Sequence, residues 1–408
     1  MVPNTDINRI RELVAEGRQV HTDAQVAQER LTPSVIPDPG ERRAAIAAVE
    51  LGVATRLGST EPGTDPPDPQ SLVAALTAEG FADLPAAHAV ALWASVFGVT
   101  FGVLVPERLT AGHDAGVNAV AWSPGGEVIA SGTDRRIWLW NPQAGSLIRS
   151  IDTGGASITS LSWCGDGTRL ASGDVDGAVL IWDTSAGRKV QSYRAPEEIW
   201  SVAWKPDGTQ VVWVCSNSVT SAPPDELSRA REIIQTVGDA PFDEAAWSPT
   251  GNAVAVTTLE SILIITTDGI VVELTSTDAP RSRPTWSPDG RYVASALESG
   301  AIQVWDAATG AEAGHLSINE IVLIDSPVYS PAGAYLAVAA DPSDLLVVDL
   351  ERRLVYAPTR PPTAMPASGR PCWSPEGDRL AVPIGAAIQT WVFVRSSERG
   401  GEPPPRSG

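Results

Sequence analysis

The sequence predicts an all-β, seven-bladed β-propeller preceded by a small α-helical N-terminal domain. Three observations predict this fold. A motif of one aromatic residue and a glycine-containing turn recurs seven times at intervals of roughly 42 residues, the period of a propeller blade. Between the copies, short apolar and β-branched runs alternate with turn residues. The first hundred or so residues lack this repeat and carry helix-capping signals instead.

The repeated motif defines the inner strand of each predicted blade, because its aromatic residue ends an apolar run and a turn that ends in Gly follows. The turn is Ser-Pro-x-Gly in five copies, Cys-Gly-Asp-Gly in the second and Lys-Pro-Asp-Gly in the third. The aromatic residues of the seven copies are Trp122, Trp163, Trp204, Trp247, Trp286, Tyr329 and Trp373. Further apolar runs follow each turn, such as 128–131 and 136–141 in the first copy. Four short strands fit in one period, so seven copies predict seven blades.

The ends of the repeat array indicate how the ring closes. The last copy has its third strand at 387–394 and is followed by a polar, proline-rich segment, 395–408, which we expect to be a disordered tail. The missing fourth strand is predicted at 100–109, ahead of the first copy. The N-terminal strand therefore closes a propeller that spans 99–394, and closure removes exposed strand edges.

The repeats resemble the WD-repeat β-propeller family over roughly 101–394. The pair Gly112-His113, the aromatic-Ser-Pro turns and the Trp-Asp endings at Trp182 and Trp305 carry this resemblance. In that family a His, a turn Asp, a strand Ser and the repeat Trp form a hydrogen-bond network that holds a blade. The resemblance implies a structural network of His113, Ser131, Asp134 and Trp140 in the first blade, and of Ser172, Asp176 and Trp182 in the second.

The later repeats also resemble those of TolB-type propellers. Pro284, Pro327 and Pro371 stand two residues before the turn aromatic. Proline has no N–H to donate to a strand ladder, so it is tolerated where its nitrogen faces away from a neighbouring strand. The inner strand of a blade has such an edge towards the central channel.

Helix signals organise the predicted N-terminal domain, residues 1–98, which resembles no family known to us. Asp6 precedes the amphipathic pattern of a first helix. An Asp-Pro-Gly-Glu capping sequence opens a second helix over 38–57, and further helices are predicted over 68–80 and 85–97. A Pro- and Gly-rich linker at about 58–68 separates them.

Charge and composition restrict the partners and the location that we expect. The chain carries 29 Lys and Arg against 49 Asp and Glu, a net charge of −20, which argues against nucleic acid and against anionic membrane surfaces as partners. The first residues lack a secretory signal, and no apolar run is long enough to span a bilayer, so we expect a cytoplasmic protein. Abundant Ala and Arg suggest a bacterial source.

Catalytic motifs are absent from the sequence. There is no G-x-S-x-G elbow, no H-E-x-x-H pair and no phosphate loop, and the four histidines are scattered. Cys164, Cys215 and Cys372 lack C-x-x-C spacing, and we interpret them as packing thiols. We therefore expect no catalytic residue, no cofactor and no metal.

One mouth of the channel is the predicted partner-binding surface. The residue four before each turn aromatic starts the inner strand there; these residues are Asn118, Thr159, Trp200, Asp243, Ser282, Asp325 and Gly369. Trp200 is the one large aromatic among them, a type enriched in binding hot spots, and either binding or local packing would explain it. Trp138 also departs from its repeat equivalents and is either exposed or part of the core. The candidate partner-binding residues are Trp200, Asp243, Asp325, Asn118 and Trp138.

These features predict a non-enzymatic scaffold or adaptor whose propeller face binds a protein or peptide, with bacterial signalling or conflict systems as candidate settings. Its oligomeric state is not predicted. The alternative is a channel site for a cation or small molecule, or a hydrolase-like enzyme, in which Asp243, Glu244 and Asp325 would be the acidic groups.

Overall fold

The structure is a computed structural model of the whole chain. It describes residues 7–15, 19–59, 68–97, 99–235, 242–280, 282–317, 324–340, 344–358 and 370–396. The predicted linker at about 58–68 and the predicted tail therefore lie almost entirely outside the described residues.

Six helices precede the repeats in the described part of the chain. They are α1 (Ile7–Ala15), α2 (Ala24–Arg30), α3 (Pro39–Glu50), α4 (Val53–Gly58), α5 (Pro69–Ala78) and α6 (Asp83–Phe97). Aspartates cap three of them, as at Asp38, whose Oδ1 accepts from the Gly40 and Glu41 amides at 2.8 Å. The predicted helix 38–57 is instead two helices, because Gly52 adopts a left-handed conformation with φ of 70° and starts a new axis. Helix α2 was not predicted from the sequence.

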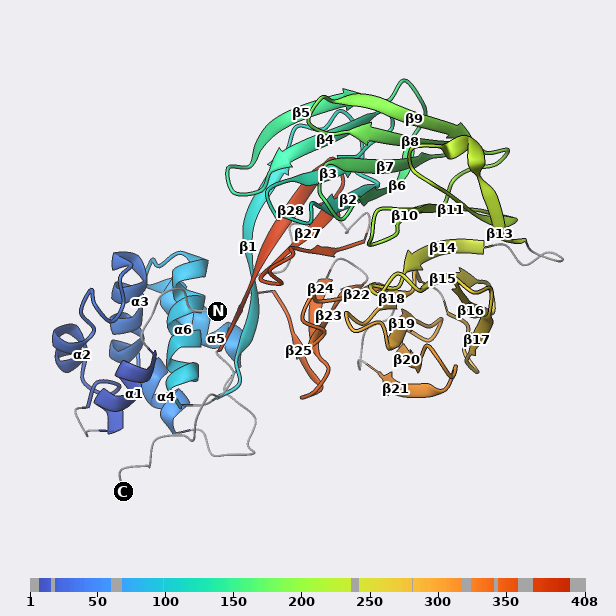
Figure 1. Cartoon of the computed structure of the whole chain (residues 1–408). Coiled ribbons are helices and arrows are strands. Elements are labelled where there is room, and N and C mark those ends of the chain that lie inside the picture. The colour runs from blue at the N-terminus through green and yellow to red at the C-terminus, as the bar shows by residue number, and fades with distance from the viewer. Residues whose placement is uncertain are drawn as a thin grey trace. The chain divides into compact units, whose positions relative to one another are not determined.

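The seven-bladed propeller predicted from the sequence is confirmed. Each described sheet has four strands, and neighbours run antiparallel wherever their register is described (Figure 1). The first three sheets are β2 (Ala119–Trp122), β3 (Ile129–Gly132), β4 (Arg136–Asn141) and β5 (Ser146–Asp152); β6 (Ile158–Trp163), β7 (Arg169–Asp174), β8 (Ala178–Asp183) and β9 (Arg188–Arg194); and β10 (Ser201–Trp204), β11 (Val211–Cys215), β12 (Ser218–Ala222) and β13 (Arg231–Gln235), with a short 3-10 helix, η1 (Leu227–Arg229).

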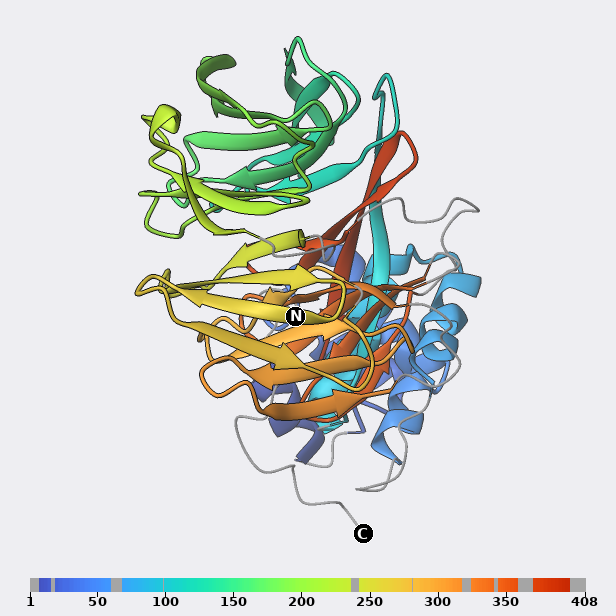
Figure 2. The same cartoon turned by 90° about the vertical axis from the view of Figure 1, so that its right-hand side faces the viewer.

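The remaining four sheets follow the same order. They are β14 (Phe242–Trp247), β15 (Ala253–Thr258), β16 (Ser261–Thr266) and β17 (Val271–Thr275); β18 (Thr285–Trp286), β19 (Tyr292–Ala296), β20 (Ile302–Asp306) and β21 (Glu312–Leu316); β22 (Ile324–Tyr329), β23 (Tyr335–Ala340), β24 (Asp344–Asp349) and β25 (Leu354–Tyr356); and β26 (Cys372–Trp373), β27 (Arg379–Ile384), β28 (Ala387–Arg395) and β1 (Gly102–Ala111). In the seventh sheet the order is β1-β28-β27-β26, so β1 is the outer strand (Figures 1 and 2).

Small residues allow neighbouring blades to pack closely. A side chain at Gly132 would collide with Ile158 of the next blade, and one at Gly173 would collide with Ile199. Apolar side chains fill the rest of the contact between the first two blades, including Leu139. Glycine is therefore required at these strand ends for packing rather than for turn geometry.

Proline shortens the inner strands of two of the later blades. Strands β18 and β26 have two residues each and begin directly after Pro284 and Pro371. In β22 the register shifts between Asp325 and Val328, around Pro327. The lost N–H donor explains why β18 and β26 are shorter than the inner strands of the first four blades, which have four to six residues. Register shifts also occur in β6 and β14, which contain no proline.

The chain forms two compact units, and the helices belong to the smaller one, which contains residues 1–107, 356–361 and 391–408. Within it, one side of the β1–β28 ribbon continues the helical core. Phe101, Val103 and Val105 alternate along β1 and its approach, and Val392 and Val394 alternate along β28; all five belong to one apolar cluster with the helices. This unit thus extends beyond the predicted boundary at residue 98.

Candidate functional site

Antiparallel pairing determines which segments of the larger unit share one end of the propeller. The turn between the second and third strands of a blade lies at the end where its first strand starts. We call this end the mouth. Asn118, Trp200 and Asp243 are exposed there, Thr159 is half-buried and Ser282 is buried. The side chain of Asp325 and the whole of Gly369 lie outside the described residues.

Trp200 is the large exposed aromatic residue at the mouth. Its backbone N–H donates to Val214 O at 2.9 Å, and its indole N–H donates to Ser216 Oγ at 3.2 Å. The residue nevertheless remains 41% exposed. The two hydrogen bonds fix the orientation of the indole ring while leaving part of its apolar surface accessible to a ligand. Because the ring is already ordered, less conformational entropy is lost on binding.

Trp138 and a further tryptophan, Trp213, are buried. Trp138 is 8% exposed and stacks on Trp140 with ring centroids 5.8 Å apart. Trp213 is 1% exposed and lies against the ring of Tyr193. We leave Trp138 out of the proposed binding surface, because its buried ring offers little area to a partner.

A hydrogen-bond chain holds the first blade. Ser131 Oγ lies 2.8 Å from His113 Nε2 and accepts from the Trp140 indole N–H at 3.0 Å. His113 Nδ1 lies 3.0 Å from Ala386 O. Asp134, predicted to belong to this network, instead accepts from Ser157 Oγ at 3.1 Å. The repeat position alone does not determine the partner of this carboxylate.

The second blade keeps part of the same arrangement. The Trp182 indole donates to Ser172 Oγ at 2.9 Å. Asp176 lies 3.8 Å from an Arg194 nitrogen rather than in a network with these two residues. Asp174 shapes the turn, because its Oδ1 accepts from the amides of Asp176 and Ala178.

Acidification is expected to destabilise the protein through His113. Burial lowers the pKa of His113 below its ordinary value of 6.5, so the unfolded chain binds the proton more tightly than the folded one. The stability that neutral His113 contributes is complete above roughly pH 6.5 and is lost as the pH falls towards the folded-state pKa. Urea midpoints at about pH 7.5 and about pH 5.5 should show a smaller acid loss in His113→Gln than in the wild type. Equal losses would contradict this prediction.

Carboxylates surround the mouth. The turns between second and third strands carry Asp134, Asp176, Glu260 and Glu298, one in each of four blades, and all four are exposed. Asp243 is exposed in the same ring. Spread over four blades, these groups give the mouth a negative potential that favours a positively charged ligand.

A charged cluster lies deeper, on the inner strands. Glu244 of β14 forms ion pairs with Arg283 and with Arg370, the latter at 3.9 Å. Arg283 Nη2 donates to Ser201 Oγ at 2.7 Å and to Ser160 Oγ at 3.4 Å. The side chains of Glu244, Arg283 and Arg370 are 29%, 19% and 24% exposed. We call these five residues the channel cluster.

The channel cluster brings together residues from five blades that share one repeat position, three residues before the turn aromatic. Glu244 was predicted from the sequence as an acidic channel group, whereas neither arginine was predicted, although both share its repeat position. Two guanidinium groups beside Glu244 oppose the binding of a cation there. The cluster therefore ties inner strands together rather than leaving a free carboxylate in the channel.

The cysteines lie in packed surroundings. Cys164 and Cys215 are buried, and burial raises the pKa of the Cys215 thiol to about 11, so it stays protonated near neutral pH. Among the residues that the structure describes, no group of three or more His, Cys, Asp or Glu side chains could hold a metal ion.

The fold and its mouth define the class of protein: a seven-bladed β-propeller with an open, acidic, aromatic-bearing end. The family model "WD domain, G-beta repeat" matches residues 105–141 and 281–306, and the model "Anaphase-promoting complex subunit 4 WD40 domain" matches residues 134–207. The repeats that these models match are thus WD-type repeats, and they make up part of the propeller. The match at 281–306 covers part of a blade whose Pro-x-Trp motif also resembles TolB-type repeats.

Curated relatives share parts of the repeat region. The "WD repeat-containing protein 26 homolog" of Arabidopsis thaliana is 30% identical over 27% of this chain and 19% of its own length. "THO complex subunit 3" of the same plant is 24% identical over 56% of this chain and 75% of its own length. "Meiotic fizzy-related protein 1" of Schizosaccharomyces pombe is 30% identical over 28% of this chain and 25% of its own length. The chain thus matches a quarter or less of the length of two of these three.

A solved structure supports the architecture. The β-propeller domain of Myceliophteria thermophila Cps50 (Swd1) superposes with a TM-score of 0.62 at 16% identity, covering 70% of this chain and 99% of that domain. This similarity concerns the fold alone. Within the described residues, no helix has the length and apolarity needed to cross a membrane.

Proposed function

We propose that this protein is a non-enzymatic interaction scaffold whose mouth binds a basic segment of a partner protein. The observation that carries the proposal is Trp200, a 41% exposed indole in a ring of exposed carboxylates. An indole supplies a large apolar area with little rotamer entropy to lose. The carboxylates supply long-range attraction for Lys and Arg side chains.

The names of the similar proteins support a scaffold function. The relative "THO complex subunit 3" and the family model "Anaphase-promoting complex subunit 4 WD40 domain" are both named for a component of a larger complex. The net charge of −20 supports a protein partner with basic groups over nucleic acid. The relatives named above are eukaryotic, so a role in bacterial signalling or conflict systems, and a cytoplasmic location, stay predictions from sequence.

Replacing Trp200 with Ala is expected to weaken partner binding while leaving the fold intact. Truncating a hot-spot residue costs roughly 2 kcal/mol or more of binding free energy, whereas an exposed side chain contributes little to folding. Affinity purification with mass spectrometry identifies the partner, and calorimetry with the purified pair then measures Kd for the wild type and the variant. The urea midpoint of each protein is measured in parallel.

Ile270→Ala is the matched control, because Ile270 is 62% exposed in the turn between β16 and β17, at the end opposite the mouth. Its Kd should equal that of the wild type. Binding should also weaken steeply with salt if the carboxylates contribute. A Trp200→Ala protein that binds as tightly as the control would refute the role of the mouth.

A thermal unfolding measurement distinguishes the scaffold from the channel-site alternative. Metal ions or small cationic compounds should leave the thermal transition of the scaffold unchanged, because only a ligand that binds the folded state shifts it. A saturable upward shift with one such ligand, removed by substitution of Asp243, would favour a channel site instead.

A further inference from the structure

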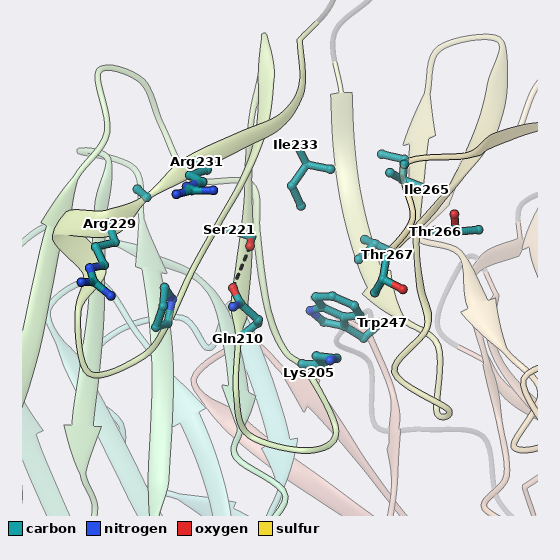
Figure 3. Close-up of a pocket in the computed structure, with 14 residues that line it drawn as sticks. Lys205, Gln210, Ser221, Arg229, Arg231, Ile233, Trp247, Ile265, Thr266 and Thr267 are labelled. Atoms are coloured by element: carbon teal, nitrogen blue, oxygen red, sulfur yellow. Dashed lines mark hydrogen bonds between the residues drawn. The ribbon is translucent and has the colours of Figure 1, made fainter.

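A pocket lies between the third and fourth blades, away from the mouth. It has a volume of about 860 Å³ and lies wholly within the larger compact unit. Figure 3 shows Gln210 and Arg231 of the third blade on one side and Thr266 and Thr267 of the fourth on the other, with Trp247 and Lys205 between them. A pocket of this size suits a drug-sized ligand or a few side chains of a peptide.

The lining is positively charged in a strongly acidic protein. Lys205, Arg229 and Arg231 line the pocket, and none of its lining residues is acidic. Lys205 and Arg229 have carboxylate neighbours outside the pocket, at 2.8 Å and 2.6 Å. Arg231 is exposed and has no ion pair among the described residues. The pocket therefore attracts an anionic ligand.

Apolar side chains of the third and fourth blades also line the pocket. Val254 and Ile265 come from β15 and β16, Trp247 ends β14, and Ile233 of β13 is 38% exposed. A small inorganic anion would leave this apolar surface unused. The combination instead fits a ligand that carries both carboxylates and apolar side chains.

The Trp247 indole leaves a donor available at the pocket, as the indoles of Trp122 and Trp204 do in their own blades. The indoles of Trp163, Trp286 and Trp373 donate to a carbonyl of the preceding blade at 3.0–3.1 Å. The Trp247 indole N–H is buried and has no hydrogen-bond partner in the part of the chain that the structure describes. An unpaired buried donor costs free energy that a ligand oxygen would recover.

Strand β13 determines the spacing between the acidic and apolar groups that such a ligand needs. Arg231 and Ile233 stand two residues apart and both line the pocket, whereas Glu232 between them does not. β13 is also the outer strand of its sheet, so its free edge can pair with an added strand. A peptide strand along it would place an acidic residue opposite Arg231 and an apolar residue two positions away.

We propose that this pocket binds an acidic linear peptide of a partner protein, with acidic and apolar residues at alternate positions on one face. The proposal is independent of the mouth, because the lining residues come from the turns between first and second and between third and fourth strands, and from strands near them. A ligand can therefore occupy one site without the other.

The test uses the full chain and a fluorescein-labelled peptide in which Glu and Leu alternate at every second position, separated by Ser. Fluorescence polarisation should show saturable binding that Arg231→Glu weakens about tenfold or more through charge reversal. The peptide with Gln in place of Glu should bind as weakly to the wild type as the Glu peptide does to the variant. Trp200→Ala should leave the affinity for this peptide unchanged. The result of this test therefore does not depend on whether the mouth binds a partner.

Arg188→Glu is the matched control. Arg188 starts β9, the outer strand of the neighbouring blade, and its replacement by Glu changes the net charge by the same amount as Arg231→Glu. It should alter the Kd less than twofold. Ile233→Ser provides a second variant if Arg231→Glu unfolds. Equal effects of Arg231→Glu and Arg188→Glu, absence of saturable binding, or full displacement of the peptide by millimolar ATP or inorganic phosphate would each overturn the proposal, the last in favour of a small-anion site.

Discussion

Deletion of residues 1–98 is expected to leave a protein that aggregates instead of a soluble propeller. The deletion removes the helices that cover Phe101, Val103, Val105, Val392 and Val394. Each of these side chains is at most 8% exposed in the full chain, and exposing one costs roughly 1.5 to 3 kcal/mol. The exposed apolar stripe on the β1–β28 ribbon would also promote association. Size-exclusion chromatography and the soluble yield measure the effect.

A second deletion protein provides the control. Replacing the four valines of this stripe with Thr in the truncated chain keeps β-branched residues while removing the apolar surface, so solubility should return. Deleting residues 1–110 should fail even with these changes, because it removes most of β1 and leaves β28 as an open edge. A soluble monomer from the 1–98 deletion alone would show that the helices are dispensable for the ribbon.

Glu244→Gln is expected to lower the free energy of unfolding of the propeller by roughly 2 to 3 kcal/mol. This loss is smaller than that expected for a fully buried ion pair, because the side chains involved remain partly exposed to solvent. The substitution leaves Arg283 and Arg370 close together without their shared carboxylate. Their repulsion adds to the lost ion pairs. The shift in urea midpoint at constant m-value measures the change.

The double variant Glu244→Gln with Arg283→Gln should recover part of the loss, since it removes one of the two uncompensated charges. Arg291→Gln is the control for an ordinary exposed pair, Arg291 with Asp306 at 3.5 Å, and should cost less than about 0.5 kcal/mol. A Glu244→Gln effect no larger than this control would mean that the channel cluster does not hold the inner strands together.

The repeat and the capping residues carried most of the fold prediction. Seven aromatic turns at one period predicted seven blades, because each blade is built from local hairpins whose turns need specific residues. Asp38 and Asp68 predicted helix starts for the same local reason. The break at Gly52 was missed, because a glycine is compatible with both a continuous helix and a left-handed turn.

The candidate sites were predicted less completely. Trp200 and Trp138 were both unusual for their repeat positions, yet one is exposed and the other is stacked on Trp140. Residue type does not determine burial when the deciding neighbours come from other strands. Asp134 shows the same limit, since its partner is Ser157 of the next blade rather than His113.

By itself, the sequence determined the features that depend on neighbours along the chain: the blade period, the turns, most helix starts and the acidic character. Tertiary structure alone decided what depends on distant residues. It placed Glu244, Arg283 and Arg370, each from a different blade, within ion-pair reach, and it continued the helical core onto β1 and β28. It also gathered three cations and Trp247 around one pocket. The reason is physical: hydrogen-bonded hairpins form between near neighbours, whereas charge pairing and burial depend on which chain segments the closed ring brings together.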